Sequence, residues 1–413
     1  MINAITCANL SPANNVINLT NSTYNLTAEA ANGDRAAPIV TAATAGTLTI
    51  NGDGATITRS SAGGTPEFNF FEVTTGANLT LNRLTLTNGS VGGNSGGAIV
   101  SDGTLTITNS TISSNVARHG GAISTTASAT TILTNSLIAN NQADRNGGAV
   151  DMSSGTMFII NSTISGNSVT GGSPSSGGGA LFSFGSATIT IINSTITNNT
   201  AARAERSGIF HTGGTLTIQN SIIANNNGAN NCDGTITDGG NNIDNGPSCG
   251  FGAGSFPNTN PNLAPLASNG GPTQTHALLP GSPAINAGTN AKAVDQNGAA
   301  LTTDQRGTGF PRINNTTVDI GAYESTSNSL DVSISMQGRT NPHPHPSYVA
   351  TIRVTIMPSG GGAVLYNQNY VTSQNGSFTI PNLPAGTYLF RFKGTHTLAW
   401  QFEMTIPGQA LSV

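Results

Sequence analysis

A repeat through the middle of the chain is the feature that most constrains its fold. The motif Asn-Ser, then Thr, Leu or Ile, then Ile recurs at intervals of 26, 26, 32 and 27 residues. Its copies start at Asn109, Asn135, Asn161, Asn193 and Asn220. A Gly-Gly-Ala motif precedes the first four copies, and another asparagine follows every start by six residues. The longest interval carries extra Gly, Ser and Pro between Thr170 and Gly177, so this insertion is confined to one unit.

Each unit holds three short strands between glycine and asparagine corners, and a period in the twenties with that content is typical of a parallel β-helix. Apolar and hydroxyl residues alternate in segments such as 79–81 and 188–191, as in strands with one buried face. Equivalent side chains of stacked units form columns about 4.8 Å apart. We therefore predict an all-β chain whose main part is a right-handed parallel β-helix. The corner asparagines tolerate a left-handed backbone, and we predict that they form a structural ladder: Asn109, Asn135, Asn161, Asn193 and Asn220.

The flanking segments complete the predicted domain organisation. Residues 1–15 have spaced apolar positions compatible with a short helix, and we expect them to cap the β-helix, whose open end is otherwise an exposed edge. The β-helix is expected over residues 16–324, and a polar linker over residues 325–329. From Leu330 to Val413 the apolar period is two, with turn residues between the runs. This pattern predicts a small antiparallel β-sandwich over residues 330–413.

Composition argues against two classes of partner. Charged residues make up 8% of the 413-residue chain and the formal net charge is −4. The basic stripe expected of a nucleic-acid-binding protein is missing. No apolar run is long enough for a membrane-spanning helix. We therefore expect a surface solvated by hydroxyls and amides, with no nucleic acid as a partner and no membrane-spanning segment.

Two of the three cysteines flank a loop rich in glycine and asparagine. A disulfide between Cys232 and Cys249 is predicted, because closing a loop of this size stabilises a fold by about 3 kcal/mol in the chain-entropy model. Two free thiols are the alternative. The disulfide would imply an oxidising compartment. Cys7 is left over, and we expect it to be buried or paired outside the chain.

Three separated motifs in the second half of the chain resemble a known family. They are residues 269–288 (which include Asn-Gly-Gly-Pro-Thr and Pro-Gly-Ser-Pro-Ala-Ile-Asn-Ala-Gly), 304–307 (Asp-Gln-Arg-Gly) and 318–324 (Val-Asp-Ile-Gly-Ala-Tyr-Glu). Together they are similar to the choice-of-anchor Q domain of secreted bacterial proteins. The Gly-Gly-Ala repeats resemble polymorphic outer membrane protein repeats, and residues 376–388 resemble carboxypeptidase-regulatory-like sandwiches.

The resemblance implies an exported bacterial protein, extracellular or on the cell surface, held by a C-terminal anchor. This chain departs from the family pattern, since no sortase motif, dockerin or terminal membrane helix is found up to Val413. We therefore expect another means of retention at the surface.

Polar residues of the second half are candidates for binding or for structure. Asp304, Arg306, Asp319 and Glu324 are predicted to form a structural polar network that closes the last rung, because buried charges persist when they are matched. Binding of a sugar or a metal is the alternative for this group.

Two further groups have metal-binding residue types. His343 and His345 alternate with prolines, which predicts a rigid connector, with Zn or Cu binding as the alternative. Asp233, Asp238 and Asp244 lie in the cysteine loop, which we expect to be solvated and without strands; Ca²⁺ binding is the alternative. No cofactor and no metal is assigned from these patterns.

Neither catalytic residues nor an enzyme activity is predicted. The acidic residues of the repeats occupy different places in their units, so they do not stack into the paired carboxylates of a glycoside hydrolase. They are Asp102, Asp144, Asp151 and Glu205.

We expect an extracellular structural or adhesive protein that self-associates head to tail into a filament. The alternative is a polysaccharide-binding or polysaccharide-degrading β-helix protein, with a surface polysaccharide as partner. Sugar clefts usually present Trp or Tyr platforms, yet the only tryptophan, Trp400, falls in the sandwich pattern. The repeats contain four aromatic residues: Phe158, Phe182, Phe184 and Phe210. This content favours the structural hypothesis.

Overall fold

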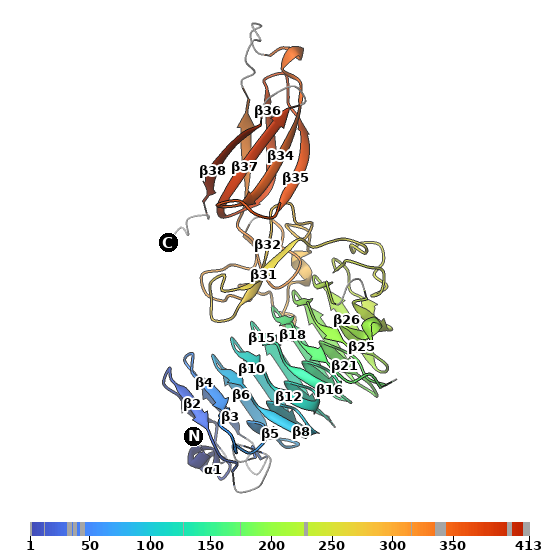
Figure 1. The fold of residues 1–413 in the computed structure, drawn as a ribbon. Coiled ribbons are helices and arrows are strands. Elements are labelled where there is room, and N and C mark those ends of the chain that lie inside the picture. The colour runs from blue at the N-terminus through green and yellow to red at the C-terminus, as the bar shows by residue number, and fades with distance from the viewer. Residues whose placement is uncertain are drawn as a thin grey trace.

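The computed structural model describes residues 2–11, 13–30, 35, 39–41, 46–126, 128–173, 175–226, 230–314, 316–334, 344–394 and 399–407. Strands dominate, in a parallel β-helix followed by a largely irregular segment and then by antiparallel sheets. The antiparallel sheets stand at the opposite end of the molecule from the N-terminal helix (Figure 1). The predicted fold class, all-β with a parallel β-helix and a terminal β-sandwich, is confirmed.

Two sheets of the β-helix have nine described strands each, all parallel. Sheet I contains β1 (Asn15–Asn18), β3 (Thr47–Asn51), β6 (Asn78–Asn82), β10 (Thr104–Thr108), β14 (Thr130–Thr134), β18 (Thr156–Ile160), β22 (Thr188–Ile192), β26 (Thr215–Gln219) and β29 (Thr237–Asp238). Sheet II contains β2 (Thr23–Leu26), β4 (Thr56–Arg59), β7 (Thr85–Thr87), β11 (Thr111–Ser113), β15 (Leu137–Ala139), β19 (Thr163–Ser165), β23 (Thr195–Thr197), β27 (Ile222–Ala224) and β30 (Ile243–Asp244).

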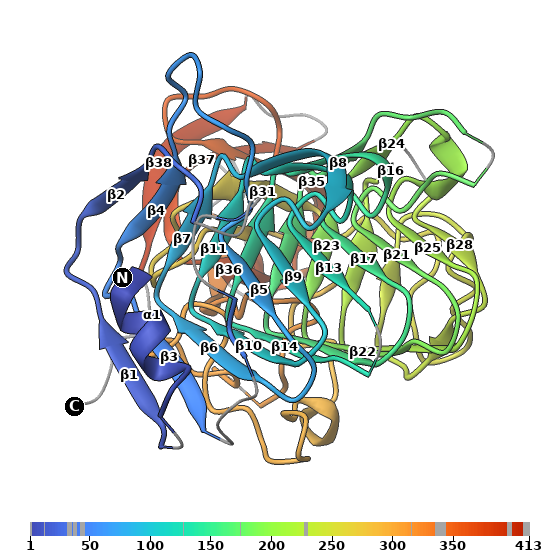
Figure 2. The same cartoon turned by 90° about the horizontal axis from the view of Figure 1, so that it is seen from below.

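Two shorter parallel sheets complete the rungs. Sheet III contains β8 (Ser90–Ser95), β12 (Val116–His119), β16 (Gln142–Asn146), β20 (Ser168–Val169) and β24 (Thr200–Ala201), which is followed by the 3-10 helix η1 (Ala204–Arg206). Sheet IV contains β5 (Phe71–Val73), β9 (Ile99–Ser101), β13 (Ile123–Thr125), β17 (Val150–Met152), β21 (Leu181–Ser183), β25 (Ile209–His211) and β28 (Cys232–Gly234). Figure 2 shows the strands of sheet IV following one another along the stack.

The core consists of apolar columns that run along the stack. In sheet I, Ile107 lies opposite Leu133, which lies opposite Ile159, and each is at most 1% exposed. Burying one such side chain contributes about 1.5–3 kcal/mol. The alternation of apolar and hydroxyl residues therefore decides which face of each strand points inward.

The Gly-Gly turn between sheets III and IV has two separate steric reasons. Gly120 has a φ of 59°, a conformation that glycine adopts without a Cβ penalty. A Cβ built on Gly121 would lie 2.3 Å from the carbonyl oxygen of Gly148 in the next rung. The first glycine provides the turn and the second allows close stacking, which explains why the pair recurs.

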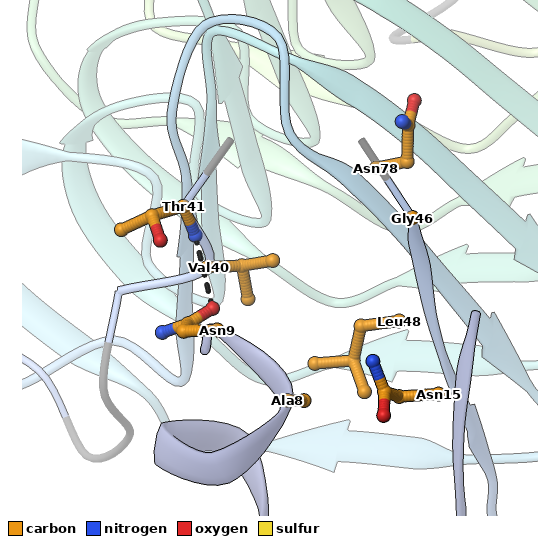
Figure 3. Close-up of a pocket in the computed structure, with 8 residues that line it drawn as sticks. All are labelled: Ala8, Asn9, Asn15, Val40, Thr41, Gly46, Leu48 and Asn78. Carbon is orange, nitrogen blue, oxygen red and sulfur yellow. Dashed lines mark hydrogen bonds between the residues drawn. The ribbon is translucent and has the colours of Figure 1, made fainter. Parts of the chain in front are cut away.

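Helix α1 (Ile2–Ala8) covers the N-terminal end of the β-helix, and its Ile5 is fully buried in the core. Asn9 donates from Nδ2 to the Ile39 carbonyl (2.6 Å), and its Oδ1 accepts from the Thr41 N–H (3.2 Å; Figure 3). The cavity drawn in Figure 3 has a volume of about 10 Å³, enough for one water at most. This end of the core is therefore closed. Cys7 is exposed and forms no disulfide within the chain.

The disulfide predicted between Cys232 and Cys249 is present, with Cα atoms 4.9 Å apart. The residues between them differ from the expected strandless loop, because they include β29 and β30 of the final rung. Asp238 and Asp244 are not simply solvated. Asp244 accepts from the N–H groups of Gly246 (2.8 Å) and Cys249 (2.9 Å). Because such bonds fix the turns, a segment rich in glycine and asparagine continues the stack.

Residues 260–325 fold back along the outside of the β-helix, and we call them the return segment. They contain the antiparallel pair β31 (Leu263–Ala267) and β32 (Thr275–Leu278), and the 3-10 helix η2 (Asn290–Lys292). Asn161 donates to the Thr303 carbonyl (2.6 Å), and Asn220 donates to the Thr289 carbonyl (2.9 Å). The segment therefore lies against several rungs, at the corner between sheets I and II.

Outward side chains of sheet II become buried where the return segment covers them. On β11, Thr111 is only partly buried. Further along this column, Leu137 and Ile222 are buried, and Ile222 joins an apolar cluster with residues of the return segment. Thr163 and Thr195, which lie between them, are buried as well and hydrogen-bond to the return segment. The return segment thus contacts these outward positions through both apolar packing and hydrogen bonds.

A ladder of buried asparagine amides runs the length of the regular rungs. Asn141 donates from both its backbone N–H and its Nδ2 to Asn167 Oδ1, at 2.9 Å each. Asn115 donates in the same way to Asn141. The members are all fully buried: Asn115, Asn141, Asn167, Asn199, Asn226 and Asn231. The Oδ1 atom of an amide such as Asn141 accepts from the backbone and side-chain N–H groups of the preceding rung, and its Nδ2 donates to the amide of the next rung.

The asparagines of the Asn-Ser motif, for which a ladder is predicted, lie at the corners between sheets I and II. They have φ values of 44–51°: Asn109, Asn135, Asn161, Asn193 and Asn220. Part of the ladder is present, since Asn220 Nδ2 donates to Asn193 Oδ1 in the preceding rung (3.4 Å), whereas Asn161 donates to the return segment. The serine that follows also stacks, since the Ser110 N–H donates to Ser136 Oγ (3.2 Å). These asparagines therefore shape the corner, next to the continuous ladder of buried amides.

The C-terminal domain consists of two antiparallel sheets around one core. One sheet pairs β33 (Ser327–Ser333) with β36 (Ser377–Pro384). The other contains β35 (Tyr366–Val371), β34 (Thr351–Pro358), β37 (Gly386–Gly394) and β38 (Trp400–Ile406) in that order. β33 begins at Ser327, within the expected linker 325–329. Asn262 donates to the Leu365 carbonyl (3.4 Å), which joins this domain to the return segment.

The two kinds of asparagine should respond differently to mutation. Asn141→Ala is expected to lower the free energy of unfolding by about 3 kcal/mol, because it leaves buried donors and acceptors of two rungs without partners. Asn135→Gly should change it by less than about 1 kcal/mol, since glycine accepts a positive φ without strain. Urea unfolding of both variants measures the difference. Equal destabilisation would contradict the distinction between ladder and corner.

Candidate functional site

Two buried arginines hold the polar network of the return segment together. Arg306 donates to Asp304 Oδ2 (2.6 Å) and to the Glu324 carbonyl (2.5 Å). Arg312 is fully buried and donates to Glu324 Oε2 (2.9 Å) and to the Asp319 carbonyl (3.1 Å). The four residues singled out in the sequence lie together. Arg312, which sequence reasoning missed, completes the pairing.

The carboxylates of this network accept hydrogen bonds from the chain itself. Asp319 accepts from the Asn286 N–H (2.7 Å) and from the Ser325 hydroxyl (2.7 Å). Burial raises the pKa of Glu324 to about 8, against the effect of Arg312. Arg312 also donates to Asn161 Oδ1 (3.2 Å). The network therefore fastens the return segment to the side of the β-helix, and it does not close the last rung as expected.

One of the two histidines that alternate with prolines caps a short helix. His345 Nδ1 accepts from the Ser347 N–H (3.1 Å) at the start of the 3-10 helix η3 (Pro346–Tyr348), whereas His343 lies outside the described residues. Within the described ranges, no three His, Cys, Asp or Glu residues are close enough to hold a metal. None of the helices that the structure describes has the length and apolarity to cross a membrane.

A surface hollow of about 350 Å³, which we call the lateral groove, lies on the outer face of sheet IV. Its lining combines three aromatic rings, one cation and three small polar side chains: Phe182, Phe184, Phe210, Arg206, Asn146, Ser175 and Thr212. Hollows of this size that combine aromatic walls with a few polar groups are typical of small-ligand sites.

The three phenylalanines pack against one another. The ring centroids of Phe182 and Phe210 are 5.1 Å apart, and those of Phe182 and Phe184 are 5.4 Å apart. Phe184 is 40% exposed, while Phe182 and Phe210 are 7% exposed. The Arg206 guanidinium lies 3.8 Å from the Phe210 ring centroid and pairs with Asp233 at 2.8 Å. The groove thus has a rigid aromatic floor and one ring available to a ligand.

An unpaired carboxyl lies next to this floor. Asp151 on β17 is the register partner of Phe182 on β21, which is in turn the partner of Phe210 on β25. The three side chains point outward in one column of sheet IV. Asp151 is 8% exposed and its Oδ1 is buried without a hydrogen-bond partner. Burial raises the pKa of Asp151 from 3.8 to about 7.

The insertion in the longest repeat forms one wall of the groove. Ser175 comes from this insertion, and a Cβ built on Gly177 would lie 2.6 Å from the Arg206 Cβ and 3.0 Å from a Phe210 ring carbon. Two signals in the sequence could have located the site: one irregular interval, and phenylalanines at equivalent positions of the two units that follow it. The small number of aromatic residues in the repeats conceals this site, because its rings gather in two adjacent units.

No protein-family model, no curated protein and no solved structure matches this chain.

Asp151 should make the stability of the protein depend on pH. Its raised pKa means that the folded state holds a proton that the unfolded chain releases near pH 4, so stability falls as pH rises from about 4 through about 7. At about 1.4 kcal/mol per pKa unit, the loss is roughly 4 kcal/mol. Asp151→Asn should therefore stabilise the protein at pH 8 and change little at pH 4. Thermal unfolding at both pH values measures this, with the exposed Asp144→Asn as the control.

Removing Arg312 should strongly destabilise the return segment. Arg312→Ala removes the donor to Glu324 Oε2 and to the Asp319 carbonyl, and each buried acceptor left without its partner costs about 1–3 kcal/mol. Arg353→Ala, which removes an exposed arginine, is the matched control and should change stability by less than about 0.5 kcal/mol. Urea unfolding at pH 7 compares the two. A similar midpoint for both variants would rule out the fastening role.

Proposed function

We propose that the protein is an extracellular, non-enzymatic structural and adhesive protein that associates head to tail through its two ends. The observation that carries the proposal is the position of exposed apolar side chains. At the N-terminal end, Leu10 is 80% exposed and Val16 is 59% exposed. In the sandwich, Val371 is 65% exposed and Trp400 is 75% exposed. Exposed apolar groups of this kind favour protein–protein contact.

Val371 and Trp400 lie at the end of the sandwich that points away from the rest of the molecule. Val371 is the register partner of Thr351, and Trp400 that of Phe392. The opposite end of the sheet contains Tyr366, next to the residues that contact the return segment. The sequence pattern suggested an inward Trp400, whereas the ring is exposed. A heterologous contact between the two ends builds a chain of molecules, because it does not close on itself.

Export to the surface is supported by two features. Disulfides such as Cys232–Cys249 persist in oxidising compartments. The motifs at 269–288, 304–307 and 318–324, similar to the choice-of-anchor Q domain, form much of the return segment and agree with a bacterial surface location. The repeats and the terminal sandwich keep their resemblance to polymorphic outer membrane proteins and to carboxypeptidase-regulatory-like domains as part of this proposal.

The test is the state of association in solution. Sedimentation velocity of the wild-type chain should give a sedimentation coefficient that rises with concentration. The double variant Trp400→Ser, Val371→Ser should remain monomeric, since it removes the apolar contact at one end only. Val116→Ser, which removes an exposed apolar side chain from the side of the β-helix, should assemble like the wild type. A wild-type protein that is monomeric at every concentration contradicts the proposal.

A second candidate function, polysaccharide binding, is favoured by the lateral groove. Its aromatic floor and polar rim are independent of the two ends. Adhesion through this groove is compatible with end-to-end association.

A further inference from the structure

We propose that the lateral groove binds a neutral carbohydrate chain that runs along the stack, across successive rungs. The inference rests on the second candidate function, polysaccharide binding, and assigns it to a site, a ligand class and an orientation. Its basis is the exposed Phe184 ring beside the packed Phe182 and Phe210 rings, with polar side chains around them.

The aromatic rings match the apolar faces of sugar rings. A pyranose presents C–H groups on one face and hydroxyls around its edge, so it packs flat on an aromatic ring while its rim stays polar. Phe184 offers 40% of its surface, and it is held in place by Phe182 beneath it. Because the aromatic rings of the floor are already packed against one another, the protein loses little conformational freedom when a sugar binds there.

The polar groups of the groove match sugar hydroxyls. Asn146, Ser175 and Thr212 lie around the aromatic floor and can both donate and accept hydrogen bonds. Hydroxyl and amide side chains of this kind match the hydroxyl groups of a sugar, which an apolar peptide or a lipid tail lacks. Asp151 is one rung from Phe182, but its partnerless oxygen is buried and does not line the groove.

Charge favours a neutral sugar. The cation of the groove, Arg206, already pairs with Asp233 and lies over the Phe210 ring. An acidic sugar would need to displace this pair, whereas a neutral sugar would not.

The groove itself spans successive rungs. Asn146 lies on β16, Phe182 on β21 of the next rung, and Phe210 on β25 of the rung after that, and rungs are about 4.8 Å apart. This spacing is close to the length of one sugar unit in an extended β-linked chain. A ligand that runs along the stack would therefore place more than one sugar unit in the groove, and longer oligosaccharides should bind more tightly than a monosaccharide.

The test uses isothermal titration calorimetry of the full chain with β-1,4-linked hexasaccharides of glucose, mannose and xylose. The wild type should bind at least one of them. Phe184→Ala should weaken that binding by about tenfold or more, as loss of a central aromatic contact does, while Phe184→Trp should retain it. Deleting residues 171–176 restores the 26-residue interval and removes the wall, so it should also weaken binding. Phe158→Ala, which removes a ring of sheet I from the same rung as Asp151, is the matched control and should bind like the wild type.

Each outcome has one interpretation. If no hexasaccharide binds to the wild type, both polysaccharide binding and this site are rejected. If the wild type binds while Phe184→Ala and the deletion bind equally well, polysaccharide binding stands and the groove is the wrong site. If galacturonate hexasaccharide or an apolar peptide binds in place of the neutral sugars, the ligand class proposed here is wrong.

Discussion

Hydrogen bonds between stacked rungs, made by buried side chains to the backbone of the next rung, are the interaction on which this structure depends. Each amide of the ladder, such as Asn141, accepts from one neighbouring rung and donates to the other. Because every unit is bound twice, a shift of register would leave several buried groups unpaired. The fixed register in turn aligns the outward columns. The groove of sheet IV and the corner that receives the return segment both depend on this alignment.

Function in such a stack is expected where the repeat is interrupted. Regular units of this chain present Thr, Ser and Asn to the outside, and these columns differ little from one another. The insertion before Gly177 raises a wall over one column, and the next two units place Phe182 and Phe210 beneath it. A site can arise in this way without any change to the ladders, since the insertion lies in a turn and the strands keep their partners.

The sequence predicted those parts of the structure that depend on local pattern. The repeat period, the strand alternation and the paired cysteines led to the β-helix, the sandwich and the Cys232–Cys249 disulfide. The path of the return segment could not be predicted, because its contacts join residues more than a hundred positions apart, as Asn161 and Thr303 do. The buried Arg312 was missed for the same reason. Two asparagines recur in every unit, and only the backbone conformation separates the corner positions, where the ladder was predicted, from the fully buried amides such as Asn141.

The attachment of the return segment has a mechanical consequence. The sandwich is not suspended from the last rung alone, because the chain that leads to it is fastened along the side of the stack, at Asn161, Asn193 and Asn220 among others. A force that pulls on the sandwich therefore acts on several rungs at once and in shear. Bonds loaded in shear share the force, whereas bonds at a single end would break one after another. The stack is in this way protected from being peeled open from its C-terminal end.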